Sequence, residues 1–254
     1  MSRDDAAPPH SRPTDDYWLI QRIAYAIAGL GGKDRFLQHR AAGMVRNSGI
    51  LPYLRDGGRY VDVGSGFGHI TEKVALAERA LATRWVAIDP AIRPSRPVRR
   101  RLNRAAARRV SFVMGLGEML PLRDGCVDGV VLFFVLHHVP RALQATVLTE
   151  ARRVVGRDGR VFLIEDTPAD AEQWSRVVRW DRRSNWESGR AEHHYRSVAE
   201  WEALAAELGF RLIDCVPFQD ISPKRAEGVI PHTNFVLQYD GGSTPAMPLG
   251  VVTD

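Results

Sequence analysis

The 254-residue sequence has few of the features that mark secreted, metal-binding or membrane proteins. Its only two cysteines, Cys126 and Cys215, are too few for a disulfide scaffold or a cysteine zinc site. Each adjoins an apolar run, so we expect buried thiols. No apolar run reaches the roughly 18 residues that cross a bilayer, and residues 1–16 lack the apolar core of a secretory signal. We therefore expect a cytoplasmic protein with no membrane partner.

Lysine is also scarce. Only Lys33, Lys73 and Lys224 occur among the 35 basic residues, so 32 are arginine, and the net charge is +5 with a pI near 9.5. A basic chain raises the question of nucleic-acid binding. The densest arginine segment, residues 93–109, falls on a predicted helix away from the expected site, where a solvated helix face explains it. We do not expect nucleic acid as a partner, and the sequence leaves monomer and homodimer open.

What the sequence does contain is a glycine-rich turn between an apolar run and a helical segment. Residues 60–71 read Tyr-Val-Asp-Val-Gly-Ser-Gly-Phe-Gly-His-Ile-Thr. Alternating glycines let the backbone turn sharply and let a ligand approach it, and the following helix presents free N–H groups. A second apolar run ends at Asp89, 21 residues after Gly68, where a carboxylate can bind ribose hydroxyls. These features predict a nucleoside-binding half of an open α/β sheet.

The spacing of the glycines indicates which nucleoside is bound. A dinucleotide fingerprint reads G-x-G-x-x-G, but here His69 occupies the third glycine position and the pattern is D-x-G-x-G-x-G. This form resembles motif I of the class I S-adenosylmethionine (SAM) dependent methyltransferases. Residues 115–122, 128–139 and 150–165 resemble, in order, the adenine loop, the fourth strand and the approach to the fifth strand of that family. The resemblance covers roughly residues 55–240 and is closest to the small-molecule, quinone and sterol methyltransferase ("type 11") branch.

The resemblance implies SAM as cofactor, with S-adenosylhomocysteine as product. Asp62 is expected to orient the glycine loop, Asp89 to bind the ribose, and the backbone of Gly117 to meet the adenine. The family's adenine-loop aspartate aligns with Leu116, so that contact must be lost or made by another group. The expected cofactor-binding residues are Asp62, Gly64, Ser65, Gly66, Gly68, Asp89, Pro90, Leu116, Gly117, Glu118, Phe133 and His138.

Methyl transfer needs alignment and, for some acceptors, a base. Candidate bases are His194 and His193, then Glu165, with His232 weaker; the two adjacent histidines could equally be exposed loop residues. The polar segment 166–195 carries tryptophans at positions 174, 180 and 186 and is expected to cover an apolar acceptor pocket. The expected substrate contacts are Tyr17, Trp18, Asp166, Trp180 and Trp186. No dense ligand motif is present, so we expect no metal.

The order of apolar runs predicts the fold. Strands are expected at 59–63, 85–88, 110–114, 129–134 and 160–165, with helices at 68–82, 96–108 and 140–155 between them. Such alternation requires a parallel sheet with right-handed crossovers, and strands this apolar are covered on both faces. After a helix at 197–208, strands at 210–216 and 234–239 complete the sheet and, as the resemblance implies, pair antiparallel. We predict an α/β, Rossmann-like, seven-stranded, mostly parallel sheet with helices on both faces, an antiparallel last strand, and helical N-terminal and lid additions.

The expected organisation is a disordered arm (1–14), an N-terminal helical cap (15–50), a methyltransferase domain (51–240, lid insertion about 166–195) and a loose tail (241–254). The sequence favours a SAM-dependent methyltransferase that acts on O, N or C of a small, partly apolar molecule. Two alternatives stay open: an RNA or protein methyltransferase that uses the arginine-rich surface, and a SAM-binding protein that does not transfer methyl groups.

Overall fold

The computed structural model describes residues 32–77, 82–90, 96–105, 109–184, 193–219 and 230–239. The expected arm at 1–14, the residues Tyr17, Trp18 and Trp186, and the tail at 241–254 lie outside these ranges. Residues 15–31, the first part of the expected N-terminal helical cap, also lie outside them.

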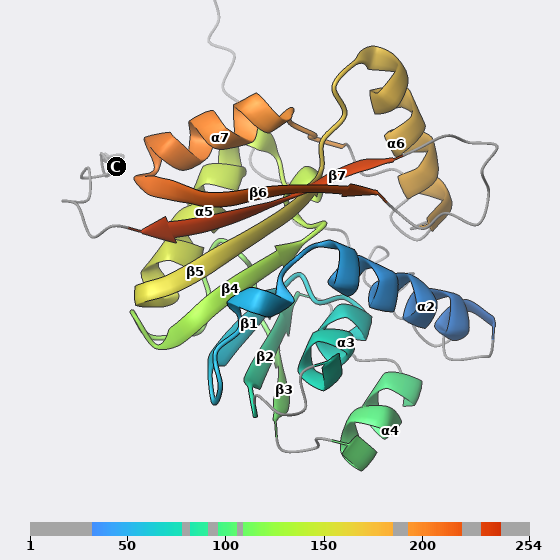
Figure 1. The fold of residues 1–254 in the computed structure, drawn as a ribbon, viewed down its shortest axis with the longest axis vertical. Helices are drawn as coiled ribbons and strands as arrows, with labels where there is room; N and C mark the ends of the chain where they lie inside the picture. The colour runs from blue at the N-terminus through green and yellow to red at the C-terminus, as the bar shows by residue number, and fades with distance from the viewer. Residues whose placement is uncertain are drawn as a thin grey trace, which may run out of the picture.

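Across the described residues, seven strands form one sheet in the order β3-β2-β1-β4-β5-β7-β6 (Figure 1). The strands are β1 Arg59–Val63, β2 Arg84–Asp89, β3 Val110–Met114, β4 Val127–Phe133, β5 Val155–Asp166, β6 Phe210–Gln219 and β7 Pro231–Tyr239. The first five pair in parallel, and β7 pairs antiparallel with both β5 and β6. The order reverses between β1 and β4, which is where open sheets of this kind bind ligands. The predicted fold class is confirmed.

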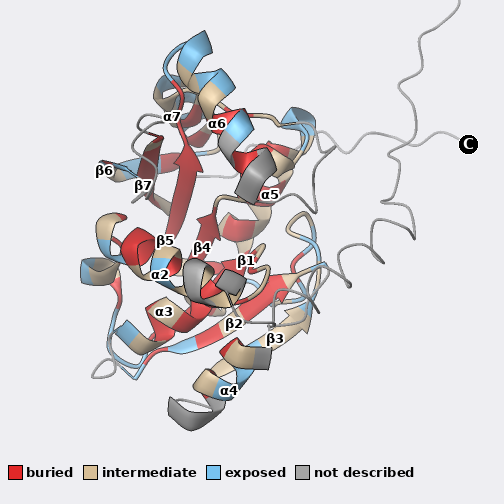
Figure 2. Ribbon diagram, turned by 90° about the vertical axis from the view of Figure 1, so that its right-hand side faces the viewer, coloured by how far each residue is buried: buried red, intermediate tan, exposed pale blue. Residues whose placement is uncertain are grey.

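Helices cover both faces of the sheet, as the apolar strands require. They are α2 Gly32–Asn47, α3 His69–Ala77, α4 Arg96–Ala105, α5 Arg141–Val154, α6 Ala171–Ser184 and α7 Val198–Glu207, with short 3₁₀ turns η1 Leu51–Tyr53 and η3 Leu136–His138. Buried residues run along the central strands (Figure 2). None of the described helices combines the length and apolar character needed to traverse a bilayer.

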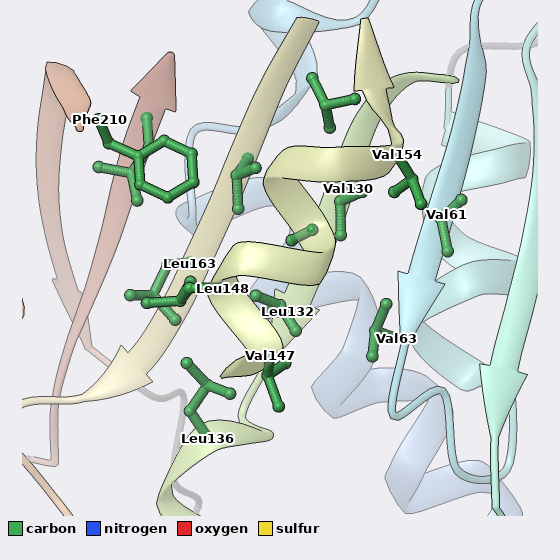
Figure 3. Close-up of a cluster of buried hydrophobic side chains, with 14 of the residues drawn as sticks. Val61, Val63, Val130, Leu132, Leu136, Val147, Leu148, Val154, Leu163 and Phe210 are labelled. Atoms are coloured by element: carbon green, nitrogen blue, oxygen red, sulfur yellow. The ribbon is translucent and has the colours of Figure 1, made fainter. Parts of the chain in front are cut away.

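Two apolar layers hold the helices to the sheet. On one face, Val147, Leu148 and Val154 of α5 pack against β1, β4 and β5 (Figure 3), and Trp201 of α7 belongs to the same cluster. On the other face, Met44 of α2 joins residues of α3 and the opposite sides of the same strands. Each strand therefore contributes side chains to both layers, which keeps the strand ends in a fixed relation.

The fifth strand starts earlier than the sequence predicts, at Val155 instead of residue 160. The chain leaves α5 in an extended conformation at Val155, which pairs with Val127 before the register shifts. Gly159 permits this irregular entry, because a Cβ there would lie 2.4 Å from a Val155 methyl.

A polar network joins α2, α3 and α4. The guanidinium of Arg101 on α4 contacts Asp34 of α2 at 3.0 Å and Glu72 of α3 at 2.6 Å, and His69 Nε2 lies 2.9 Å from Asp34 Oδ1. The Glu72 side chain is only 1% exposed, so its charge needs this partner. Arg101 thus departs from the solvated face expected of segment 93–109, whereas Arg100 is exposed.

We expect Arg101→Met to lower the free energy of unfolding by about 2–4 kcal/mol, because it leaves the buried Glu72 carboxylate without its ion-pair partner. The exposed Arg100→Met on the same helix is the matched control and should change stability by less than about 0.5 kcal/mol. Urea unfolding followed by circular dichroism measures both. Equal effects of the two substitutions would contradict the assignment of Arg101 as the ion-pair centre.

Candidate functional site

The glycine loop joins β1 to α3 at the carboxyl edge of the sheet. Gly64, Gly66 and Gly68 have φ values of +72°, +50° and +78°, which glycine adopts without the steric cost that a side chain imposes. Gly64 is also packed tightly, since a Cβ there would lie 2.5 Å from a methyl of Val135. The N–H groups of Gly64 and Ser65 donate to Ile88 O at 2.8 and 3.1 Å. The loop is thus held against the end of β2.

Asp89 at the end of β2 reaches this loop. Its Oδ2 accepts a hydrogen bond from Gly66 N–H at 2.9 Å, so the carboxylate lies at the loop, as the spacing predicts. The Ser65 hydroxyl beside it is buried and has no hydrogen-bond partner among the described residues. A buried polar atom without a partner is uncommon, and a ligand hydroxyl or charged group would satisfy it.

An exposed apolar surface adjoins Asp89. Met114, Leu116 and Met119 are 69%, 51% and 74% exposed, and Gly115 N–H between them donates to Asp89 O at 3.3 Å. Gly117 packs closely, since a Cβ there would meet Val147 at 3.2 Å. This surface can pack against a flat apolar ring, and the Asp89 carboxylate beside it can accept hydrogen bonds from hydroxyl groups, so these residues fit an adenosine group.

Asp62 lies beneath the loop and is 2% exposed. Its carboxylate accepts a hydrogen bond from the Thr71 hydroxyl of α3, which fixes the start of that helix relative to β1. Burial, together with the nearby charge of Asp89, raises the pKa of Asp62 to about 7 despite the Thr71 hydrogen bond.

The loop after β4 is organised by Glu165, the penultimate residue of β5. Glu165 is fully buried. Its Oε1 accepts hydrogen bonds from Val135 N–H at 2.9 Å and Leu136 N–H at 2.6 Å, and its Oε2 lies 2.6 Å from His137 Nδ1. The sequence suggested Glu165 as a candidate base. Every one of these contacts ties it to the β4 loop.

The same loop contains a strained backbone position. Phe134 has a φ of +58°, which is uncommon for a residue other than glycine and clusters at functional sites. Its N–H donates to Ile164 O at 2.8 Å. Phe133, the expected contact for the methionine part of the cofactor, is the last residue of β4 and pairs with Ile164.

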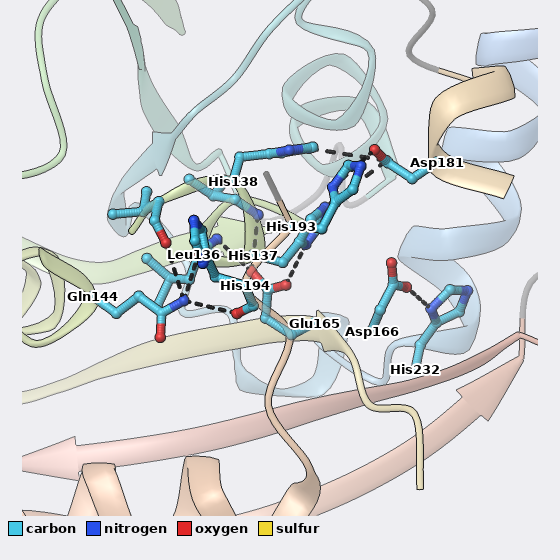
Figure 4. Close-up of polar contacts among 12 residues, drawn as sticks. Leu136, His137, His138, Gln144, Glu165, Asp166, Asp181, His193, His194 and His232 are labelled. Atoms are coloured by element: carbon cyan, nitrogen blue, oxygen red, sulfur yellow. Dashed lines mark hydrogen bonds and ion pairs between the residues drawn. The ribbon is translucent and has the colours of Figure 1, made fainter. Parts of the chain in front are cut away.

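A histidine cluster, formed by His137, His138 and His193, faces helix α6 (Figure 4). Asp181 of α6 has Oδ1 at 3.9 Å from both His137 Nε2 and His138 Nε2, and Oδ2 at 3.5 Å from His193 Nδ1. Although burial opposes its charge, the carboxylates of Glu165 and Asp181 raise the pKa of His137 to about 10. Burial and the neighbouring His137 charge lower the pKa of His138 to about 3.

Gln144 of α5 ties the segment before α7 to the β4 loop. Its Nε2 donates to Leu136 O at 2.8 Å and to His194 O at 3.0 Å, while its Oε1 accepts from Arg196 Nε at 2.6 Å. His194 N–H in turn donates to His137 O at 2.8 Å. The backbone of His194 is therefore fixed on both sides beside the β4 loop.

The expected substrate contacts fall in different places. Asp166 is buried and its Oδ1 lies 2.6 Å from His232 Nδ1 (Figure 4), so both side chains are held in one pair; the charge of His232 lowers the pKa of Asp166 against the effect of burial. Trp180 lies on α6 and Trp174, also on α6, is 44% exposed. Tyr17, Trp18 and Trp186 lie outside the described residues.

Three groups in this arrangement were missed by sequence reasoning: His137, Gln144 and Asp181. His137 adjoins the predicted His138, and the pair of adjacent histidines was the available signal. Gln144 and Asp181 lie on helices with no motif around them, so only the packing of α5 and α6 brings them to the site.

Comparison with known proteins agrees with this geometry. Residues 61–163 match the family model of a methyltransferase domain. The chain is 32% identical over 139 residues to the ubiquinone/menaquinone biosynthesis C-methyltransferase UbiE of Methylobacterium nodulans, covering 55% of this chain and 54% of that protein. It is also 32% identical over 120 residues to an uncharacterized methyltransferase of Mycobacterium tuberculosis, covering 47% and 44%. The matches span about half the length of these relatives.

Solved structures share the fold. The 1,6-didemethyltoxoflavin-N1-methyltransferase of Burkholderia thailandensis, solved with 1,6-didemethyltoxoflavin and S-adenosylhomocysteine, aligns with a TM-score of 0.61 at 17% identity over 94% of this chain and 99% of that one. The O-methyltransferase NcsB1 from neocarzinostatin biosynthesis, solved with S-adenosylhomocysteine and 1,4-dihydroxy-2-naphthoic acid, aligns with a TM-score of 0.56 at 21% identity over 80% and 57%.

The raised pKa of Asp62 has a consequence for stability. Because this pKa lies near 7 in the folded chain and at 3.8 for an ordinary aspartate, folding takes up a proton between about pH 4 and 7, and the free energy of unfolding falls as pH rises through that range. Asp62→Asn removes this contribution. The free energy of unfolding of Asp62→Asn minus that of the wild type should therefore rise by more than about 1 kcal/mol between pH 4.5 and pH 8. Urea unfolding at several pH values measures the difference.

Thr71→Val provides the second variant. It removes the hydrogen bond that opposes the rise in the Asp62 pKa, so the fall in stability should extend to higher pH. Parallel stability curves for wild type and Asp62→Asn would show that Asp62 does not titrate in this way.

Proposed function

We propose that this chain, which carries a class I SAM-dependent methyltransferase domain of the type 11 branch, binds SAM at the glycine loop and Asp89 and methylates a small, partly apolar molecule. The observation that supports this most directly is the Asp89 carboxylate, hydrogen-bonded to Gly66 N–H at the point where β1 and β2 end, beside an exposed apolar surface. A carboxylate, a glycine turn and an apolar face are the groups that recognise a ribose, an amino-acid chain and a base.

On the cofactor side, each group has a distinct role. Asp89 accepts hydrogen bonds from the ribose hydroxyls, and the buried Ser65 hydroxyl meets the methionine part. Leu116 and Met119, both exposed, pack on the adenine ring. Leu116 stands at the position where the family that this chain resembles has an aspartate. Apolar packing thus replaces one polar contact. When bound, SAM supplies a methyl group already activated by the sulfonium charge.

Pro90, Gly117, Glu118, Phe133 and His138 complete the cofactor side in this proposal. Pro90 follows Asp89 directly, while Gly117 and Glu118 follow the exposed Leu116. Phe133 and His138 come from the end of β4 and from η3, so they flank the glycine loop on the side where the sheet order reverses. The acceptor side is then formed by α6, which carries Trp174, and by the described residues from His193 onward.

Small-molecule acceptors are favoured by the relatives. The two solved neighbours carry 1,6-didemethyltoxoflavin and 1,4-dihydroxy-2-naphthoic acid, which are small and partly apolar, and UbiE is named as a quinone-pathway C-methyltransferase. The acceptor atom is identified by incubating the protein with SAM and a metabolite extract, then searching by mass spectrometry for a compound that gains a methyl mass.

Where the acceptor carries a hydroxyl or a protonated amine, a base must accept its proton. Among the predicted candidates, Glu165 is committed to the β4 loop and His193 faces Asp181. His194 has its backbone fixed at both the N–H and the C=O and is partly exposed. We therefore rank His194 first, since a fixed backbone positions its imidazole and histidine is the side chain that most often transfers protons in catalysis.

Calorimetry with SAM, S-adenosylhomocysteine and NAD tests the cofactor. SAM and S-adenosylhomocysteine should bind and NAD should not. Asp89→Ala and Asp89→Asn should each weaken SAM binding by about 1–3 kcal/mol, because the ribose hydroxyls lose a charged acceptor. Asparagine keeps one oxygen for Gly66 N–H, so if Asp89 only positioned the loop, Asp89→Asn would bind SAM as wild type does. NAD binding without SAM binding would overturn the proposal.

For an acceptor that must lose a proton, His194→Ala should lower kcat by about 10²- to 10⁴-fold with SAM affinity preserved. His39→Ala, an exposed histidine on α2, is the control. A fully active His194→Ala variant would show that alignment alone suffices or that another group is the base.

A further inference from the structure

The histidine cluster beneath α6 (His137, His138 and His193) contains a buried ring nitrogen that makes no hydrogen bond within the described residues. His137 is 1% exposed, and its Nδ1 faces the Glu165 carboxylate at 2.6 Å. Its Nε2 is buried and has no hydrogen-bond partner within the described part of the chain. The Asp181 oxygen that it faces is 3.9 Å away, which is too far for a hydrogen bond. A buried ring nitrogen held at that distance from a carboxylate indicates room for a third atom between them.

Other possible metal-ligand atoms lie around the Asp181 carboxylate. His138 Nε2 is also 3.9 Å from Asp181 Oδ1, and one donor atom from each of His137, His138 and Asp181 lies within 4.8 Å of the other two. His193 Nδ1 lies 3.5 Å from the second oxygen of Asp181. Two ligands of one zinc-sized ion, each about 2.0–2.1 Å from it, can lie up to about 4.2 Å apart. The two 3.9 Å separations fall within that limit, so small side-chain movements would bring these donors around one ion.

We propose that His137, His138 and Asp181, with His193 as a fourth donor, bind a divalent transition-metal ion such as Zn²⁺. Imidazole nitrogens with one carboxylate select this class over Mg²⁺ or Ca²⁺, which prefer oxygen ligands. The Glu165 carboxylate supports the assignment, because a metal-binding histidine commonly donates its other ring N–H to a carboxylate that fixes the ring. The ion joins three segments: the β4 loop, the lid helix α6 and the residues that precede α7.

This inference concerns a structural site and does not depend on methyl transfer. An ion at this point would attach α6, through Asp181, to the loop that borders the proposed cofactor site. The expected consequence of metal binding is slower opening of α6, independent of whether SAM or an acceptor is present.

The test uses the full chain, stripped with a chelator and titrated with Zn²⁺ by calorimetry and with Co²⁺ by visible absorption. We expect one ion per chain and, for Co²⁺, the intense visible bands of a low-coordinate site with nitrogen ligands. His138→Ala and Asp181→Asn should each weaken binding at least about 100-fold, since even outer-shell changes cost 10- to 100-fold. His138 is 30% exposed and Asn has the shape of Asp, so both variants should fold, which circular dichroism checks.

His39→Ala is the matched control, because His39 is an exposed histidine on α2 and should bind Zn²⁺ as wild type does. Amide hydrogen exchange gives an independent readout: Zn²⁺ should slow exchange across α6 in wild type and leave it unchanged in Asp181→Asn. The proposal is overturned if the wild type fails to bind one ion, if His39→Ala weakens binding as much as His138→Ala, or if folded His138→Ala and Asp181→Asn bind as wild type does.

Discussion

The carboxylate of Glu165 is fully buried at the end of β5, and a buried charge persists only where donors surround it. Here the donors are consecutive residues of one loop: the N–H groups of Val135 and Leu136 and the ring of His137. Meeting all three requires the chain to turn over the end of β5 as it leaves β4. That turn directs Leu136 O and His137 O outward to Gln144 and His194. One carboxylate thereby determines where the β4 loop, α5 and the segment before α7 meet.

The meeting of the glycine loop with Asp89, on which the proposed cofactor side rests, could be predicted from sequence because its parts are local. Parallel strands that are neighbours in the sheet bring their carboxyl ends together, so the loop after β1 and Asp89 after β2 had to meet, and Asp89 Oδ2 indeed lies 2.9 Å from Gly66 N. The strands themselves were predictable because their two-sided burial leaves continuous apolar runs. The early start of β5 at Val155 was not predictable, because it depends on a register shift that the periodicity of the sequence does not encode.

The acceptor side could not be predicted in the same way. His137, Asp181 and His193 come from three segments, and their meeting depends on how α6 packs. That packing uses a small apolar cluster of Val177, Val178, Tyr195 and Ile230, too short a pattern to show which way the helix docks. Glu165 illustrates the same limit: its position at a strand end suggested a base, while the N–H groups that occupy it come from a loop whose conformation no motif specifies.

The two helical additions share a mode of attachment that bears on how the site opens. Asp34 of α2 pairs with His69 and Arg101, and Asp181 of α6 faces the histidine cluster. Separating polar partners has a modest net free-energy cost, because water replaces the lost hydrogen bonds. Separating large apolar faces costs more, because it exposes apolar surface to water. Among the described residues the apolar cluster of α6 is small beside the two layers on the sheet, so α6 can separate from the domain at lower cost than α5 or α7. Elements that admit substrates are drawn from this low-stability end of a structure, and the lid that the sequence predicts between residues 166 and 195 includes α6.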